Sequence, residues 1–267
     1  MIQLQKILNE FQIGLEIEFY SKVSKKEIQK QLSNILGKKI IIPKTIVGLD
    51  KKETVVHSDF VPTGNEYKLE PDFSGGKDMK ELITGPLLYQ EARLQLIDIL
   101  NWIKDNGWTT KKTGIHINIS VNNPNKLNLT QNIINMDRLK FSLNFDEEEI
   151  YKFFPERRNN VYANSIKNIV PVHPFIFSNS VSSINPNNYK TPNTKYYTVN
   201  FLKQENNYLE FRLIGGVNYH LKIYHILEVM DYCCETIYNT LKKPEYTKEN
   251  LIILNNITKK HKKIIES

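Results

Sequence analysis

Three stretches of the chain alternate strictly between apolar and polar residues, which is the pattern of a strand with one buried face. They are residues 12–20, 114–121 and 208–214. Side chains two positions apart point to the same side of a strand, so each stretch also presents one polar face. The pattern therefore predicts three strands that each bury one face.

The rest of the chain predicts shorter strands and several helices. Strands are expected at 38–47, where Pro43 suggests an edge, at 54–60, at two places within 66–84, and at 195–202 as a hairpin with 208–214. Helical spacing occurs at 24–35, 88–106, 129–143, 147–154, 219–242 and 247–264. Because strands and helices alternate irregularly, we expect an α+β fold with an antiparallel sheet rather than a doubly wound parallel one.

The helical spacing also predicts which residues face the core. For the helix at 24–35, Ser24 is the expected cap and the buried residues are Ile28, Leu32 and Ile35. For 88–106 they are Tyr89, Ala92, Leu96, Leu100 and Ile103. For 219–242 they are Leu221, Tyr224, Leu227, Cys234 and Leu241.

A chain of 267 residues fits one large domain, and we treat 1–267 as a single domain. Residues 155–194 are rich in Asn, Pro and Ser, which suits either a disordered linker or an irregular cover of an active site. The segment also carries Tyr162, Val170 and Phe175. These apolar residues favour the cover.

The net charge of +7 has two interpretations, a nucleic-acid surface or a lysine-rich solvated surface. The second is favoured, because no nucleic-acid-binding motif occurs and much of the excess lies between Lys259 and Lys263. A basic cleft would also suit nucleotides. Cys233 and Cys234 are adjacent and lack metal-type spacing. With no signal-peptide pattern and no membrane-length apolar stretch, we expect a cytoplasmic protein that makes no membrane contact.

The polar faces of the predicted strands carry the candidate chemistry. Glu16 and Glu18 share one face, and Glu81 stands opposite Leu82 in its strand. The other two faces present His116, Asn118 and Ser120, and Glu210 and Arg212. Each face alone is most simply a solvated one. Adjacent carboxylates repel each other, however, and their recurrence on neighbouring strands would require a cation.

An oxygen-rich set with one histidine suits Mg²⁺ or Mn²⁺ better than Zn²⁺. Arg212 lies on the same face as Glu210, and an arginine beside a carboxylate-bound cation is suited to holding a phosphate. This combination favours phosphoryl chemistry.

The order of these motifs resembles that of the amidoligases, which belong to the carboxylate–amine ligases together with glutamine synthetase and glutamate–cysteine ligase. The matching pieces span residues 12 to 230. They are Gly14–Glu18, Asp72–Ser74, Glu81–Pro86, Thr113–Asn118, Pro155–Ala163 and Glu210–Arg212.

The resemblance implies a catalytic sheet of the glutamine-synthetase type that binds metal ions and ATP on its concave face. It implies an ATP-dependent ligase that phosphorylates a carboxylate, after which an amine attacks the acyl phosphate. The expected substrates are amino acids, peptides or other amines, and a homo-oligomer is compatible with this. The implied metal ligands are Glu16, Glu18, Glu81, His116 and Glu210. Arg212 would stabilise the phosphoryl group, with Glu210 and Glu18 as its catalytic neighbours.

The resemblance also implies contacts to nucleotide or substrate. Those candidates are Arg157, Arg158, Lys195, Asn118, Asn200, Asp72 and Ser74. Arg157 and Arg158 equally suit a surface salt-bridging pair, and Asp72 and Ser74 an ordinary turn. Two positions depart from the family pattern: Asn118 replaces a frequent histidine, and Lys195 replaces an arginine and loses its two-pronged geometry.

Three functions remain open from the sequence. The first is an ATP- and Mg²⁺-dependent ligase. The second is a ligase-fold module that binds without catalysis, which the departures at Asn118 and Lys195 suggest. The third is a metal-dependent phosphohydrolase or nuclease that uses the same carboxylates.

Overall fold

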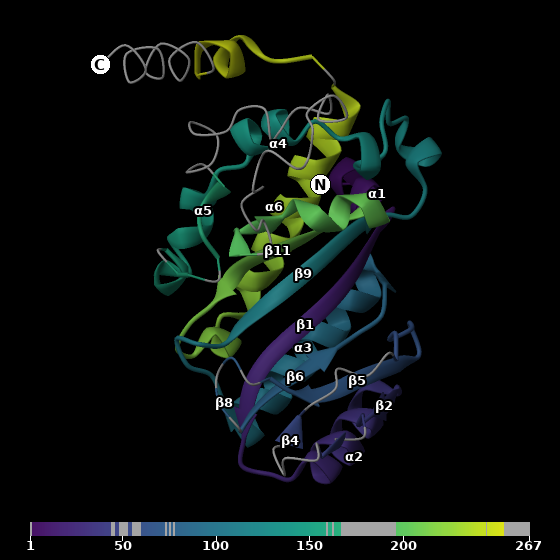
Figure 1. Cartoon of the computed structure of the whole chain (residues 1–267). Coiled ribbons are helices and arrows are strands. Elements are labelled where there is room, and N and C mark those ends of the chain that lie inside the picture. The colour runs from purple at the N-terminus through teal and green to yellow at the C-terminus, as the bar shows by residue number, and fades with distance from the viewer. Residues whose placement is uncertain are drawn as a thin grey trace, which may run out of the picture. The chain divides into compact units, whose positions relative to one another are not determined.

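The chain forms a nine-stranded, mostly antiparallel sheet flanked by helices, as seen in a computed structural model (Figure 1). The structure describes residues 2–43, 46–47, 53–54, 60–72, 74, 76, 78–158, 160–161, 163–166, 196–243 and 245–253. This architecture confirms the predicted α+β class.

The sheet is built from strands of very unequal length. They are β1 Phe11–Ser21, β2 Lys39–Ile41, β5 Glu66–Pro71, β6 Met79–Ile83, β7 Leu87–Leu88, β8 Gly107–Trp108, β9 Gly114–Val121, β10 Val199–Asn200 and β11 Tyr208–Gly215. Their order is β10-β11-β9-β1-β6-β5-β2, with β7 and β8 each paired to β1. The strands β2 and β5 pair in parallel. Two further strands, β3 Ile46–Val47 and β4 Glu53–Thr54, pair with each other.

The helices are α1 Ile2–Leu8, α2 Lys25–Leu36, α3 Tyr89–Asn106, α4 Arg138–Asn144, α5 Glu147–Tyr151 and α6 Ile223–Lys242. Short 3₁₀ turns lie between them, including η2 Ile133–Asn135, η3 Pro155–Arg157, η8 Phe201–Asn206 and η9 Tyr219–Leu221. No described helix is both long and apolar enough to cross a membrane.

The chain divides into two compact units. The first unit comprises residues 1–11, 119–213 and 229–267, and the second comprises 12–118 and 214–228. The predicted ligands Glu16, Glu18, Glu81 and His116 all belong to the second unit. Glu210 and Arg212 belong to the first.

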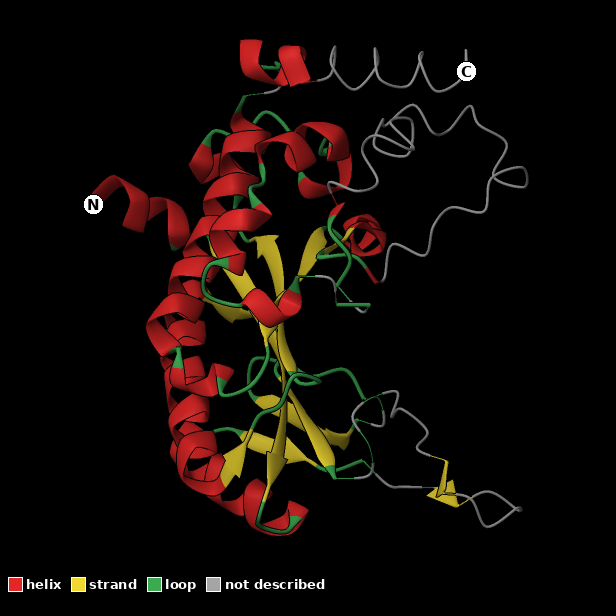
Figure 2. Cartoon of the chain, turned by 90° about the vertical axis from the view of Figure 1, so that its left-hand side faces the viewer, coloured by secondary structure: helices red, strands yellow, loops and turns green. Residues whose placement is uncertain are grey.

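In the second unit, the apolar face of β1 packs against helices. Its residues Ile13, Leu15, Ile17 and Phe19 are fully buried, as the alternation predicts. Phe19 meets Trp102 of α3 edge to face, with ring centroids 5.7 Å apart. Figure 2 shows red helices along one side of the yellow strands. Because strand side chains alternate, the glutamates of β1 lie on the side away from α3.

Helix α2 shows how local signals set its ends. The hydroxyl of Ser24 accepts a hydrogen bond from the backbone N–H of Glu27, as the cap prediction requires. The helix ends at Gly37, whose φ of 62° is left-handed. Ile28 and Leu32 are buried as predicted, but Ile35 is half exposed and Leu36 takes its place in the core. The buried stripe follows the i, i+4 row from Ile28 and so reaches Leu36, not Ile35.

Two other helix predictions require correction. The helix expected at 129–143 occupies only Arg138–Asn144, because the Asp137 carboxylate accepts from the Lys140 N–H and fixes the start there. The helix expected from 219 begins at Ile223. Leu221 therefore precedes it and is exposed, as is Tyr224. The predicted core residues Leu227, Cys234 and Leu241 are buried.

Some strand and loop predictions are shortened or lie outside the described residues. The strand predicted at 195–202 forms only Val199–Asn200, because the Asn200 side chain accepts from the Leu202 N–H and starts a 3₁₀ turn. Of the strand predicted at 54–60, residues 55–59 lie outside the described residues. The same holds for 159, 162 and 167–194 of the proposed cover and for the last helix beyond 253.

The backbone packs closely around Gly85, which lies just after β6. A Cβ there would lie 2.2 Å from the carbonyl carbon of Thr63, whereas at Gly64 the nearest atom would be 3.5 Å away. We expect Gly85→Ala to lower the free energy of unfolding by about 1–3 kcal/mol, as overpacking does. Gly64→Ala is the matched control and should change it by less than about 0.5 kcal/mol. Urea denaturation measures both, and equal stability of the two variants would contradict the packing.

Candidate metal centre

Three glutamates face one another across three neighbouring strands of the second unit. Glu18 of β1 is the register partner of Glu81 of β6, which is also the partner of Glu70 of β5. Figure 1 shows these three strands side by side. Residues opposite each other in antiparallel strands point to the same side, so the carboxylates share one face. Like charges in this arrangement repel and destabilise the sheet unless something offsets them.

Glu70 was not among the predicted site residues, although a weak signal for it exists. In β5, Tyr67 and Leu69 are fully buried while Lys68 and Glu70 alternate with them. The carboxylate of Glu70 pairs with the Lys68 ammonium at 3.1 Å. Six residues give too short an alternation to point to a site. Only the pairing with β6 shows that Glu70 belongs beside Glu81.

Glu16 is held by two side chains of β9. Its Oε2 lies 2.9 Å from His116 Nδ1, and its Oε1 accepts a hydrogen bond from the Asn118 side-chain nitrogen at 2.9 Å. His116 is buried, with Nε2 3.7 Å from Glu18 Oε1. In the tautomer with the hydrogen on Nδ1, toward Glu16, Nε2 carries the lone pair with which a neutral histidine ligates a metal.

Glu18 is fixed from two directions. The backbone N–H of Gly114 donates to Glu18 Oε2 at 2.7 Å, and the phenol of Tyr219 donates to the Glu18 carbonyl oxygen at 2.6 Å. Both bonds are buried. Tyr219 was not among the predicted site residues, because it lies about two hundred residues from Glu18 in the sequence and belongs to no motif. These contacts hold the carboxylate in place before any ligand arrives.

Glu81 differs from its neighbours because it has no local partner. Among the described residues, no group donates a hydrogen bond or forms an ion pair with its carboxylate. Burial raises the pKa of Glu81 well above its usual range, and the negative charges of Glu16, Glu18, Asp72 and Glu70 raise it further. The carboxylate therefore favours either a proton or a cation.

Glu16, Glu81 and His116 could hold one metal ion together. One ligand atom from each lies within 4.8 Å of the other two. Oxygen ligands of Mg²⁺ lie at about 2.0–2.1 Å, so ligands on opposite sides of the ion are about 4.2 Å apart. Adjacent ligands of an octahedral ion lie closer, about 2.9 Å apart, so the three side chains would draw together on binding, and the donor set suits Mg²⁺ or Mn²⁺.

Asn118 supports this site in an unexpected way. Its nitrogen must face Glu16, because the reverse orientation would place two oxygens against each other. Its Oδ1 is then buried without a hydrogen-bond partner among the described residues. The space for this side chain depends on Gly14, whose added Cβ would lie 3.4 Å from Asn118 Cβ. Asn118 therefore orients Glu16, whatever else it contacts.

Asp72 and Ser74 form a local turn. The Asp72 carboxylate accepts from the Ser74 N–H at 2.8 Å and from its hydroxyl at 3.0 Å. This is the turn that the sequence left open as an alternative to a ligand contact. The charge of Asp72 nevertheless acts on Glu81, as its raised pKa shows.

The predicted residues of the first unit form a cluster of their own. The guanidinium of Arg212 pairs with Glu210, whose other oxygen accepts from the Asn200 side chain at 2.9 Å. Glu210 and Asn200 are buried. Arg157 is also buried, and its Nη2 donates to the Arg212 carbonyl oxygen at 2.7 Å. Arg157 thus supports the strand that carries Arg212.

Two predicted contact residues remain, Arg158 and Lys195. Arg158 lies at the surface, where its guanidinium forms a two-pronged ion pair with Glu148 and covers the ring of Tyr151 at 5.0 Å. This is the surface pair that the sequence left open for Arg158. Lys195 lies outside the described residues.

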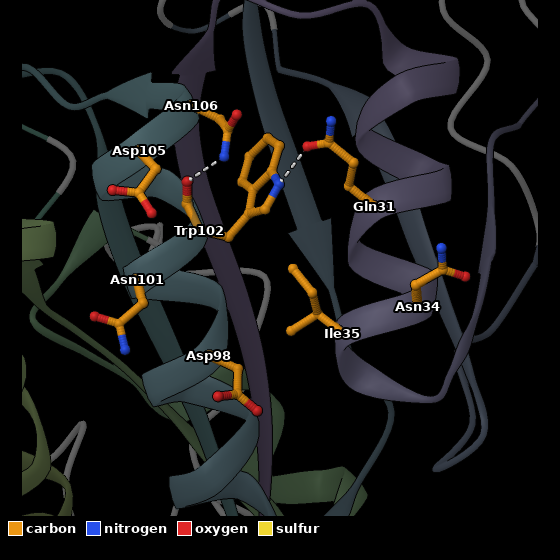
Figure 3. Close-up of a pocket in the computed structure, with 8 residues that line it drawn as sticks. All are labelled: Gln31, Asn34, Ile35, Asp98, Asn101, Trp102, Asp105 and Asn106. Carbon is orange, nitrogen blue, oxygen red and sulfur yellow. Dashed lines mark hydrogen bonds between the residues drawn. The ribbon is translucent and has the colours of Figure 1, made fainter.

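A separate pocket of about 500 Å³ lies between α2 and α3, on the helix side of the second unit (Figure 3). Trp102 stands in it, with its indole N–H donating to Gln31 Oε1 at 2.8 Å. The rest of its lining is Asn34, Ile35, Asp98, Asn101, Asp105 and Asn106. These amides and carboxylates include no base paired with a nucleophile, so the pocket offers no catalytic arrangement.

Comparisons with known proteins add no assignment, because the sequence matches no protein-family model and no curated protein.

Cation binding should be measurable as a gain in stability. We expect saturating Mg²⁺ or Mn²⁺ to stabilise the fold by about 2–3 kcal/mol, the effect of a ligand at about one hundred times its Kd. The Glu16→Gln, Glu18→Gln double variant should be slightly more stable without metal and should lose the gain. Differential scanning fluorimetry in EDTA and in MgCl₂ tests this. Melting temperatures indifferent to both ions in both proteins would show that the site is wrong.

The raised pKa of Glu81 predicts a pH dependence without metal. The folded state keeps the Glu81 proton at pH values where the unfolded chain has lost it. Stability should therefore fall as pH rises from the unfolded value of about 4.3 to the raised one, by about 1.4 kcal/mol per pH unit at most. Glu81→Gln should flatten this slope and raise stability at pH 8. Urea denaturation in EDTA from pH 4 to 8 measures it.

Glu66→Gln is the matched control, because Glu66 lies on the neighbouring strand β5 and pairs with Lys39 in a largely exposed bridge. This variant should keep the wild-type slope. The same slope in the Glu81→Gln variant as in the wild type would contradict the assignment.

Proposed function

We propose that the protein is an ATP- and Mg²⁺-dependent carboxylate–amine ligase that forms an amide through an acyl phosphate. The observation that supports this is the half-buried carboxylate of Glu81, which lies between Glu18 and Glu70 and has no partner among the described residues. A divalent cation is the natural neutraliser of such a face. The motif order quoted above adds the ligase chemistry to the cation requirement.

The proposed reaction has two steps. A substrate carboxylate attacks the γ-phosphorus of ATP, and ADP leaves as the acyl phosphate forms. The nitrogen of an amine then attacks the acyl carbon, releasing phosphate and a proton as the amide forms. A bound divalent cation would supply charge neutralisation at the phosphate oxygens.

The residues of this chain take defined roles in the proposal. Glu16, Glu81 and His116 hold the cation, and Asn118 orients Glu16 by its hydrogen bond. Arg212 keeps the role that the resemblance gives it, offsetting charge on the transferring phosphoryl group, and the contacts of Glu210 with Arg212 and Asn200 favour a role in positioning that arginine rather than in binding metal. A curved sheet of the glutamine-synthetase type is part of the same proposal.

The replacement at Asn118 does not remove the hydrogen bond that a site of this kind needs. An amide nitrogen donates to Glu16 here, and a histidine nitrogen would offer the same donation. We therefore propose that Asn118 preserves the orientation of Glu16. This argues against a module that has lost catalysis through this position.

The second candidate is a metal-dependent phosphohydrolase or nuclease. The net charge of +7 favours it, because nucleic acid is the commonest partner of a basic surface. It needs the same cation but no ATP. The two functions therefore differ in their products rather than in their metal site.

ADP release is the direct test. Purified protein with ATP and MgCl₂ should release ADP in the presence of a suitable amino acid, peptide or polyamine, and mass spectrometry should detect an amide. Glu81→Gln should lower the rate at least about one hundredfold, because it removes a charged ligand of the cation. Glu66→Gln should retain it. Absence of ADP with every acceptor, together with cleavage of DNA or RNA without ATP, would select the hydrolase.

A further inference from the structure

An aromatic pair stands at one end of the candidate metal centre. Tyr20 of β1 and Trp108 of β8 are register partners, and their rings stack with centroids 5.6 Å apart and an interplanar angle of 11°. Trp108 is 39% exposed. Gly107 makes this approach possible, because a Cβ there would lie 2.4 Å from the Tyr20 carbonyl oxygen. The backbone thus brings Trp108 against β1.

The aromatic pair lies on the same face of the sheet as the glutamates. Tyr20 follows Glu18 by two positions in β1, so their side chains point the same way and lie about 7 Å apart along the strand. Trp108 stands opposite Tyr20 and shares that face. Glu18 therefore lies between the aromatic pair and Glu16.

This combination of an open indole and nearby carboxylates favours a positively charged ligand. The face of an indole ring attracts cations more strongly than that of any other side chain. Glu16 and Glu18 share this face with Glu81 and Glu70, and the negative charges of Glu16, Glu18, Asp72 and Glu70 all act on Glu81. Their field concentrates cations beside the aromatic pair. An alkyl chain next to the charge would gain further contact with the rings.

We propose that Tyr20 and Trp108 form the binding surface for a cationic amine, a primary ammonium on an alkyl chain such as a lysine side chain or a polyamine. The role of this amine as a substrate rests on the proposed ligase function. The binding of the amine to this surface does not. The ammonium lies over the Trp108 ring, and the alkyl chain packs beside Tyr20.

A nucleotide base is the competing occupant, since bases also stack on aromatic rings. The position of Glu18 argues against it. A base on Trp108 would draw its sugar and first phosphate past the Glu18 carboxylate, where like charges repel. An amine meets attraction at the same place.

Tryptophan fluorescence can test this surface without any turnover. The chain has two tryptophans, and the other, Trp102, is buried between α2 and α3. In a Trp102→Phe variant, emission reports Trp108 alone. We expect spermidine and Nα-acetyl-lysine amide to change this emission and to reduce quenching by acrylamide. The same lysine derivative acetylated on its side-chain nitrogen should have no effect.

Ring variants separate recognition from folding. In the Trp102→Phe background, Tyr20→Leu should weaken amine binding about threefold to fivefold, the contribution of one exposed cation–π surface, while Tyr20→Phe should restore it. Isothermal titration calorimetry of the wild-type protein provides the reference affinity for the amine. In the same measurement, Trp108→Leu should lose amine binding. Melting curves confirm that each variant folds.

The outcomes are distinct. Unchanged Trp108 emission with every amine, or a response to MgATP and not to amines, overturns the proposal. A response to amines without ADP release under any condition leaves this surface standing and rejects the ligase. ADP release without a Trp108 response rejects the surface and leaves the ligase standing.

Discussion

The repulsion among Glu18, Glu81 and Glu70 is the constraint on which the candidate site depends. At about 4–5 Å, two unit charges of like sign cost about 1 kcal/mol in water and about 4 kcal/mol near a protein surface. The strands cannot relieve this cost by slipping. A shift of one residue in β1 would turn the fully buried Ile17 and Phe19 outward and drive the glutamates into the core. The packed apolar face thus holds the carboxylates together. Lys68 offsets the charge of Glu70, and a proton or a cation at Glu81 relieves the remaining repulsion.

Two other carboxylates of the chain show how the protein itself can compensate a buried negative charge. Glu210 is buried between the Arg212 guanidinium and the Asn200 amide. Glu147 is also buried and accepts from Ser165, the Ile166 N–H and Thr198. Each is fully supplied with donors, as buried charges generally are. Glu81 has no such donors among the described residues, and this contrast separates a structural glutamate from a ligand-binding one.

The sequence predicted well those features of the fold that depend on a single strand or helix. Alternation gave β1, β9 and β11 and their polar faces, and spacing gave α3 and its buried residues. It predicted poorly those contacts that depend on which strands and segments pair with each other. Glu70 became a site residue only through its register with Glu81. Tyr219 supports Glu18 from a segment with no motif. Nothing in the alternation of a single strand specifies its neighbours, so the sequence alone did not reveal these contacts.

Arg157 illustrates why residue type alone does not reveal a role. Its motif suggested a ligand contact, yet its guanidinium binds the carbonyl oxygen of Arg212. The cause lies in β10, which pairs with β11 only at Val199 and Asn200. Beyond that point, Thr198 accepts the Arg212 N–H, and the carbonyl needs another donor. A planar fork with two donors supplies it where the strand ends. The Thr198 N–H, which would donate to this carbonyl if the ladder continued, donates to the Asn164 carbonyl oxygen at 2.8 Å instead. The role of Arg157 therefore follows from where β10 begins, which no motif in the sequence specifies.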